Sequence, residues 1–296
     1  MIILVITWAD QFYQFEYFSN HFSMKKRKML ILNLTKDKIM SYPNFPRKYS
    51  EKAIVTPKEY INYKKKRGYY SDFIPPESVI FFFQRSLKEY ISNNYSIKQV
   101  EGFSSLFLLT ETKGAVGVCG EFGIGAPSTI VIMEELIAHG VRNFIAIGTA
   151  GALQNDLPLN SIIVCEKAIR DEGTSHHYLK REKYALPSPS LTQAIKTKLD
   201  ELQIEFISGT TWTIDAPYRE TVAEIKQYQA EGVLTVEMEA AALFAVANYR
   251  KVDAAALVTI SDYVEEHAWT PQFHSRGEQL AKLFRLALEV LTSSSR

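Results

Sequence analysis

The chain has 296 residues, 46% of them hydrophobic and 23% charged, which excludes a wholly disordered or collagen-like protein. Lys and Arg number 34 against 33 Asp and Glu, so the net charge of +1 gives no basic excess that would favour nucleic acid binding. Cys119 and Cys165 are too few for a disulfide framework, and we expect both to be buried thiols in a reducing cytoplasm. No apolar run approaches the ~20 residues that span a bilayer, and the opening MIILVIT has no basic segment before it, so neither a membrane span nor a signal peptide is expected.

The first part of the chain differs in composition from the rest. Residues 1–23 are either an extension from an upstream start codon, since Met24 opens a second, basic start (MKKRKM), or an aromatic segment that packs on the body or on a partner. The run KKKR at 64–67 is interpreted as a solvated turn rather than a polyanion site, because the overall charge is balanced. Pro75-Pro76 marks the predicted boundary between an N-terminal extension and accessory segment, 1–77, and a main domain, 78–296.

From residue 78 onward, short apolar runs alternate with segments of helical periodicity. This pattern predicts an α/β fold: a single domain with a central twisted mixed sheet, partly closed and flanked by helices. The expected turn lies at Lys113-Gly114, and Gly140 is expected to end a helix. The predicted strands are 79–83, two within 104–120, 141–148, 161–169 and 252–261, and the predicted helices are 85–94, 128–140, 191–203, 237–250 and about 275–293.

Two glycine-containing loops follow predicted strands, where open α/β sheets bind their ligands. The loop 120–128 exposes backbone N–H groups at a helix start, so it is either an anion site or a tight structural turn. In the loop 148–152, Thr149 adds a hydroxyl suited to phosphate or sugar oxygens, although a plain strand-to-loop turn explains this loop equally well.

Three carboxylates are candidates for chemistry. Glu237 and Glu239 flank Met238 at the start of an almost continuously apolar helix. They either complement the helix dipole or, as buried groups that need partners, accept hydrogen bonds from a sugar diol. Asp262 ends the strand 252–261 and is either a general acid or a helix N-cap. His176 and His177 have acidic neighbours, but adjacent side chains do not converge on one ion, so no metal is expected.

Taken together, GIGAPS at 123–128, IGTAGAL at 147–153, VEMEAAALF at 236–244 and TISDY at 259–263 resemble the nucleoside phosphorylase superfamily of the uridine and hexameric purine type. The four motifs occur in the family's order and spacing, over about three quarters of the chain. The resemblance implies a homo-oligomer, a dimer or a hexamer built of dimers, with active sites completed across subunits. It implies nucleoside and phosphate as substrates and no metal or organic cofactor.

The resemblance also implies roles for individual residues. Asp262 matches the aspartate that protonates the leaving purine, and is the expected catalytic residue. Met238, Glu239 and Thr149 are expected to bind ribose. The expected phosphate-binding residues are Gly123, Gly125, Gly148 and Thr149, and the expected base-binding residues are Tyr218, Glu237, Trp212 and Arg219.

Two departures from the family pattern bear on the reaction. Ala146 stands where phosphorylases place an arginine, and the early phosphate motif is absent; Arg85 is an imperfect substitute. Cations from Lys58 or Arg67 are another source, across a subunit boundary. The expected activity is cytoplasmic phosphorolysis of a purine ribonucleoside to free base and ribose 1-phosphate, in salvage. The alternatives are a uridine phosphorylase, a phosphate-independent nucleosidase and a catalytically silent nucleoside-binding protein.

Overall fold

The computed structural model describes residues 45, 47–69, 73–273 and 276–293, without the side chains of Ser104 and Arg276. The chain divides into two compact units, Met1–Pro46 and Arg47–Arg296. Residues 1–23, and the two interpretations of them, lie outside the described residues. The second unit begins well before residue 78, because helix α3 (Pro57–Lys66) packs against helix α5 (Ala126–His139).

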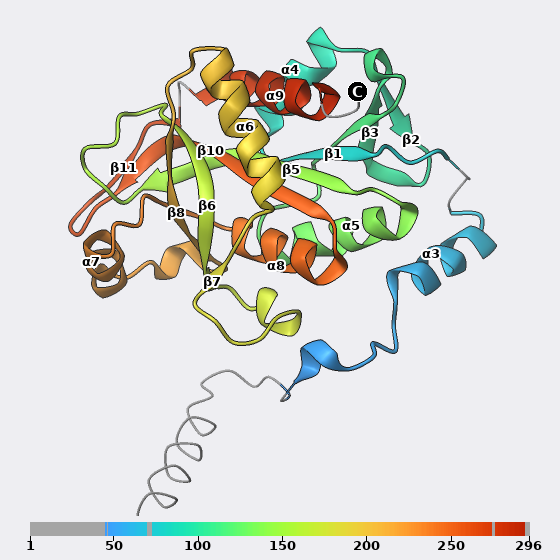
Figure 1. The fold of residues 1–296 in the computed structure, drawn as a ribbon, viewed down its shortest axis with the longest axis horizontal. Helices are drawn as coiled ribbons and strands as arrows, with labels where there is room; N and C mark the ends of the chain where they lie inside the picture. The colour runs from blue at the N-terminus through green and yellow to red at the C-terminus, as the bar shows by residue number, and fades with distance from the viewer. Residues whose placement is uncertain (1–44, 46, 70–72, 274–275, 294–296) are drawn as a thin grey trace, which may run out of the picture. The chain divides into compact units, whose positions relative to one another are not determined.

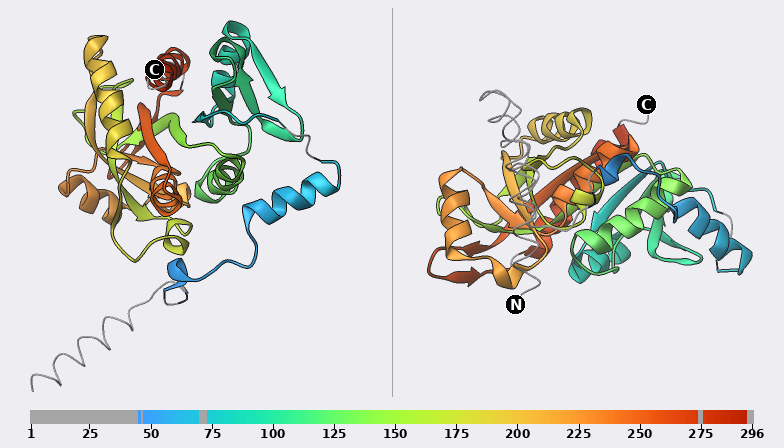
Figure 2. Two further views of the ribbon diagram at one scale, coloured as in Figure 1. Left: turned by 45° about the vertical axis from the view of Figure 1, so that its right-hand side comes forward. Right: turned by 90° about the horizontal axis from the view of Figure 1, so that it is seen from below.

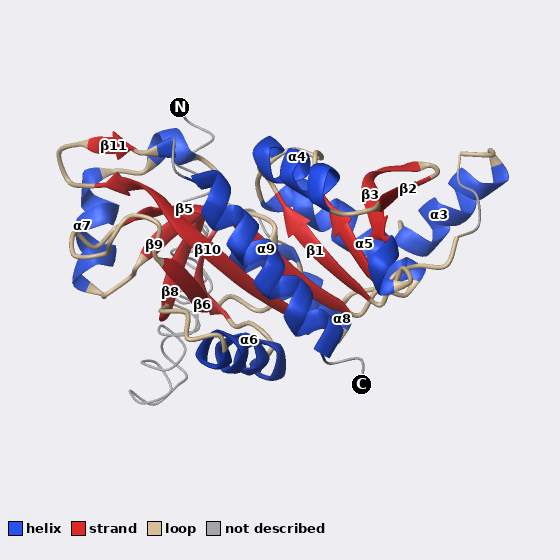
Figure 3. Cartoon of the chain, turned by 90° about the horizontal axis from the view of Figure 1, so that it is seen from above, coloured by secondary structure: helices blue, strands red, loops and turns tan. Residues whose placement is uncertain are grey.

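The described strands form one mixed sheet (Figures 1 and 3). Their bounds are β1 Ser78–Phe82, β2 Ile97–Val100, β3 Phe103–Leu109, β4 Val116–Cys119, β5 Asn143–Ala152, β6 Ile162–Asp171, β7 Tyr184–Ala185, β8 Ile207–Ile214, β9 Thr235–Glu237, β10 Asp253–Val264 and β11 Trp269–Pro271. The short connection between β3 and β4 turns at Lys113 and Gly114, both with positive φ, as predicted.

Five strands close into a ring. β5 pairs in parallel with β10, β10 antiparallel with β6, β6 in parallel with β8, β8 in parallel with β9, and β9 antiparallel with β5. The sheet then continues outward from β5 through β1, β4, β3 and β2. The predicted partly closed mixed sheet is therefore confirmed.

Helices cover the sheet in two layers (Figures 1 and 2). On one face, α5 and α8 (Ala240–Arg250) share a hydrophobic core with β5 and β10. On the other face, α4 (Arg85–Asn94), α6 (Pro189–Glu201) and α9 (Arg276–Ser293) pack together. Cys119 and Cys165 are buried free thiols, as predicted. The remaining described helices are α3, already given, α7 Val222–Ala230, and the 3₁₀ turns η1 Lys48–Ser50, η2 Thr110–Thr112, η3 Ser175–His177 and η4 Pro217–Arg219.

Local sequence explains where several helices begin and end. Pro127 occupies the first turn of α5, where a missing N–H costs nothing, and Gly140, at φ 119°, ends the helix as predicted. The run 64–67 forms the last turn of α3 and its C-cap, so the predicted turn is instead helical. A helix starting at residue 237 is also wrong, because Thr235–Glu237 pairs with β5 and β8, and α8 begins at Ala240.

Among the described residues, no helix combines the length and the apolar character needed to cross a bilayer.

Candidate active site

A cavity of about 710 Å³ opens where the carboxyl ends of β1, β5, β9 and β10 converge. One end is formed by Phe83 and Gln84, with Gly148 and Thr149 of β5 beside them. The other end is formed by η4, the start of α7 and the β10–β11 hairpin. Of the predicted site residues, Gly148, Thr149, Tyr218, Glu237, Met238, Glu239 and Asp262 line this cavity.

Asp262 is held in place at both carboxylate oxygens. Ser261 Oγ donates to Oδ1 at 2.6 Å, and Trp269 Nε1 donates to Oδ2 at 2.8 Å. The side chain belongs to β10, beside a register shift between Ile260 and Asp262 that turns successive side chains toward the cavity. Because the residue lies inside a strand, its interpretation as a helix N-cap is wrong. A buried, oriented carboxyl in a cavity is suited to proton transfer.

The carboxylate of Glu237 is engaged in hydrogen bonds within the chain. Its Oε2 accepts the backbone N–H groups of Glu239 at 2.8 Å and Ala240 at 2.7 Å, and its Oε1 accepts from Thr213 Oγ1. The carboxylate therefore satisfies the exposed amides at the start of α8, which is the first of the two expected explanations. Burial raises the pKa of Glu237, and the hydrogen bonds oppose this shift. A contact between Glu237 and a base would compete with these bonds.

Glu239 has a freer carboxylate. Its Oε1 accepts the backbone N–H of Gly125, while no described side chain donates to it. Burial, with the nearby charge of Glu237, raises the pKa of Glu239 to about 8. Met238 lies beside it and approaches Gly125 closely, since a Cβ on that glycine would meet Met238 Cε at 3.8 Å. Met238 and Glu239 both line the cavity.

The loop 120–128 is a tight turn. Glu121, Gly123 and Gly125 have φ of 61°, 97° and 91°, the left-handed region that favours glycine. Gly125 gives its N–H to Glu239, so that amide binds the chain's own carboxylate. The structure does not bring Gly123 or Gly125 to the cavity lining, where Ile124 stands instead.

Gln84 is a site residue that the sequence did not reveal. Its Nε2 donates to Thr149 Oγ1 at 3.3 Å, and its buried Oε1 has no hydrogen-bond partner among the described residues. An unpaired buried oxygen is costly unless a ligand or water donates to it. Its position directly after the predicted strand 79–83 was the one feature of the sequence that could have indicated a site residue.

The structure places only some of the predicted base-binding residues at the cavity. Tyr218 lines the cavity from η4 and is 99% exposed, while its neighbour Arg219 does not line it. Trp212 is fully buried, donates to Asp171 Oδ2 at 3.0 Å and packs on Tyr228. The alternation of β8 turns Thr213 toward Glu237 and Trp212 to the opposite side, so a base contact by Trp212 does not fit this structure. Glu220 and Trp269 line the cavity and were missed.

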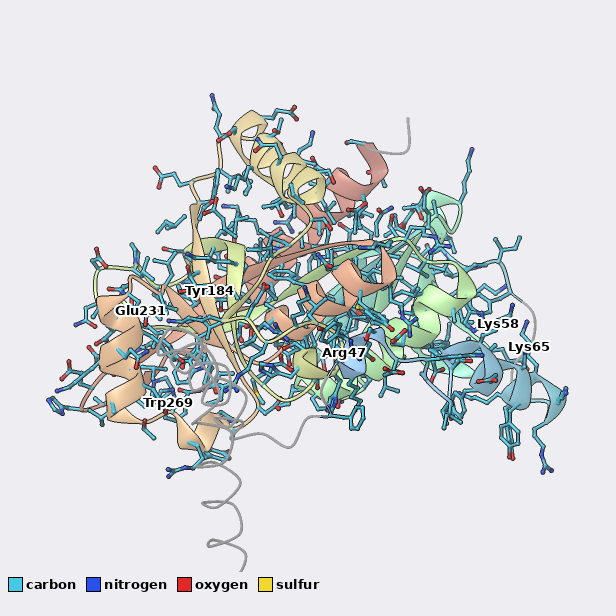
Figure 4. All side chains as sticks on the ribbon, turned by 60° about the horizontal axis from the view of Figure 1, so that its bottom comes forward. Arg47, Lys58, Lys65, Tyr184, Glu231 and Trp269 are labelled. Carbon is cyan, nitrogen blue, oxygen red and sulfur yellow. The ribbon has the colours of Figure 1, made fainter. Side chains whose placement is uncertain are left out.

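The cavity is acidic. Five carboxylates line it, and none of its described lining residues is Lys or Arg. Arg85 is not among the lining residues, and its side chain is 88% exposed and paired to Glu89 at 3.2 Å. Lys58 and Lys65 on α3 lie at the opposite end of the unit from Trp269 (Figure 4). Within one described chain, none of the expected cations reaches the cavity. The lining carboxylates are Glu220, Glu237, Glu239, Asp262 and Glu265.

The family model of the phosphorylase superfamily matches residues 83–292, and this chain therefore belongs to that superfamily. A purine nucleoside phosphorylase of the DeoD type from Aliivibrio fischeri is 30% identical over 195 residues, covering 62% of this chain and 81% of the relative. A uridine phosphorylase from Treponema pallidum is 35% identical over 149 residues, covering 47% of this chain and 58% of the relative. The crystal structure of an AMP nucleosidase from Bacteroides thetaiotaomicron shares the fold, with a TM-score of 0.65 at 23% identity over 81% of this chain and 99% of that one.

Proposed function

We propose that this protein cleaves the N-glycosidic bond of a purine ribonucleoside with phosphate, giving the free base and ribose 1-phosphate. The observation that carries the proposal is Asp262, a carboxyl oriented by Ser261 and Trp269 inside the cavity of a phosphorylase-superfamily chain. The DeoD-type relative supports the purine preference.

The chemistry assigns separate tasks to the two ends of the cavity. Bond cleavage leaves positive charge on the sugar and negative charge on the base. Asp262 gives a proton to the departing purine and takes it back from solvent afterwards. Glu239 and Met238 hold the ribose, with Glu239 accepting hydrogen bonds from its hydroxyls, so that the anomeric carbon is presented for attack.

The phosphate would lie near Gly148 and Thr149, at the Gln84 end of the cavity. Because the described lining of that cavity holds no Lys or Arg, we propose that a second copy of the chain in a homo-oligomer supplies the positive charge. No metal or organic cofactor is required by this scheme.

Substitution of the acid tests the proposal. Asp262→Asn keeps the shape of the side chain but removes its proton, and a positioned acid contributes about 10²–10⁴-fold. We expect kcat for purine nucleosides to fall within that range, measured as base release from inosine, guanosine and adenosine. Asp253→Asn, at the other end of β10, is the matched control and should retain wild-type turnover. Wild-type turnover by Asp262→Asn would contradict the assignment.

Hydrolysis is the second candidate, and two observations favour it. The cavity lining is acidic, and Gln84 Oε1 is a buried acceptor suited to a water or a hydroxyl rather than to a phosphate dianion. A hydrolase would release the same base and free ribose in buffer without phosphate.

A further inference from the structure

Helices α5 and α8 pack against each other and are linked by polar contacts at two places (Figure 1). At the cavity, the backbone N–H of Gly125, the N-cap of α5, donates to the carboxylate of Glu239, the N-cap of α8, at 2.5 Å. Farther along both helices, Arg250 donates to Glu134 twice, from Nε at 2.7 Å and from Nη2 at 2.8 Å. The two helices therefore run in the same direction, with one link at the cavity and the other about 15 Å along their axes.

The link between Glu134 and Arg250 is largely removed from solvent. The side chain of Glu134 is 9% exposed and that of Arg250 is 33% exposed. Burial, the charge of Glu134 and a hydrogen bond to Glu134 raise the pKa of the Tyr178 hydroxyl, so η3 joins the same group. A planar guanidinium that meets a carboxylate through two bonds fixes both their distance and their orientation. Neither partner lines the cavity, so this pair can influence the reaction only through the helices that it joins.

The geometry of Glu239 depends on where α5 stands. Its carboxylate accepts backbone hydrogen bonds from Gly125 and Met238, and of these two residues only Gly125 belongs to another segment of the chain. Gly125 has a φ of 91° and offers its N–H at the start of α5, which no side chain of its own N-cap satisfies. A shift of α5 along α8 would carry this N–H away, and the carboxylate would follow it or lose it. The register of the two helices thus sets the position of Glu239 in the cavity.

Hydrophobic packing alone defines this register weakly. Most of the buried residues of α8 are alanines, which share one core cluster with the buried residues of α5. Small side chains allow close approach but form shallow ridges, which interdigitate less than those of larger side chains. A buried ionic pair is satisfied in one register only, because each partner left alone would be an uncompensated charge. The pair of Glu134 and Arg250 is therefore suited to fix the register that the alanines leave loosely defined.

We propose that Glu134 and Arg250 are positioning residues for Glu239. They hold α5 in register with α8, so that Gly125 orients the carboxylate of Glu239 toward the ribose hydroxyls. The inference rests on the proposed function, because that function assigns the ribose to Glu239. It adds a specificity device outside the cavity, since the preference for a ribonucleoside over its 2'-deoxy analogue then depends on a pair of residues that touches neither substrate.

The sugar supplies a readout that a merely structural role would not move. A 2'-deoxyribonucleoside lacks one of the hydroxyls that a ribonucleoside offers to Glu239. The ratio of kcat/KM for inosine to that for 2'-deoxyinosine therefore reports how well the carboxylate is placed. A general loss of folded protein lowers both values together and leaves the ratio unchanged. Glu239→Gln gives the reference ratio for a side chain that has lost one acceptor oxygen.

The double substitution Glu134→Gln/Arg250→Met removes the pair without leaving a buried charge unpaired. The glutamine still offers an acceptor to Tyr178. Since a misplacement of about 1 Å costs on the order of a hundredfold, we expect the ratio to fall about tenfold to hundredfold, toward that of Glu239→Gln. In the Glu239→Gln background, removing the pair should lower the ratio no further. An unchanged ratio, or equal losses for the two nucleosides, would overturn the proposal.

Two single substitutions complete the test. Arg285→Met is the matched control, because Arg285 of α9 donates to the Tyr90 hydroxyl of α4 at 2.8 Å in the other helical layer, and its loss should leave the ratio at the wild-type value. Arg250→Lys keeps the charge but replaces the two-pronged contact by a point charge, so its ratio should be intermediate. This conservative variant decides the matter if the double variant does not fold, and a wild-type ratio in Arg250→Lys would then overturn the proposal.

Failure of the proposed function can be told apart from failure of this inference. If the wild type turns over no nucleoside, the proposed function is wrong, and titration calorimetry with inosine and 2'-deoxyinosine tests the positioning role by itself. Tighter binding of inosine that the double variant loses supports the inference. Absent binding, equal binding of the two nucleosides by the wild type, or an undiminished preference in the double variant overturns it.

Discussion

Two glutamates two positions apart have different environments. Glu237 has both oxygens engaged at the start of α8 and at Thr213. Glu239 accepts backbone hydrogen bonds from Gly125 and Met238 and lines the cavity. The charge of Glu237 contributes to the raised pKa of Glu239, because the two carboxyl groups are buried close together. The glutamate that fixes the start of α8 and the glutamate that we propose binds the sugar are therefore distinct residues, separated by Met238.

The ionisation of Glu239 should appear in the pH profile. Its pKa is raised to about 8, and only the ionised form has both oxygens free of a proton to accept from the ribose hydroxyls. We expect kcat/KM to rise with pH and to level off above about pH 8 for every nucleoside.

The measurement is a pH profile of kcat/KM for wild type and Glu239→Gln with adenosine and inosine. The variant should be slower and should lack the rise toward pH 8. A variant that keeps the same rise would show that another group titrates.

At the scale of the elements, the close pairing of β5 with β10 positions the acid. Gly151 lies directly opposite Asp262 in the register. A Cβ on Gly151 would meet Val264 Cγ2 at 2.7 Å and Asp262 Oδ2 at 3.1 Å. Because Gly151 has no side chain, the carboxyl group of Asp262 has room beside β5.

Gly151→Ala should therefore displace Asp262 while leaving the ring of strands assembled. A displacement of about 1 Å costs on the order of a hundredfold in rate, so we expect kcat to fall by about that much, with a lowered melting temperature. Gly277→Ala on α9 is the control, because a Cβ there meets no atom within 4 Å. Wild-type kcat in Gly151→Ala would contradict this account of the strand pairing.

The sequence predicted the elements whose signals are local. Helix α4 falls on the expected residues, and Gly140 ends α5 as expected. The three-residue strand β9 was missed because its conformation depends on pairing with β5 and β8, while its sequence runs into an apolar helix. Trp212 was misjudged because motif position does not say which side of β8 a residue faces. Gln84 and Glu220 could not be identified as cavity residues from the sequence, because the segments that carry them come together only in the folded chain.

For the whole molecule, ring closure gathers the ends of distant strands into one acidic cavity. Helix α3, with its lysines, lies at the opposite end of the unit from α7 and β11 (Figures 1 and 3). Phosphorolysis therefore depends on the positive charge that we propose a second copy supplies, whereas hydrolysis needs no such charge. The distribution of charge makes phosphate dependence the central question.

The most direct measurement is base release from guanosine, inosine, adenosine and uridine, with and without phosphate, together with identification of the sugar product. We predict turnover of purine nucleosides that requires phosphate and yields ribose 1-phosphate. Equal turnover without phosphate, yielding free ribose, would contradict phosphorolysis and identify the protein as a nucleosidase.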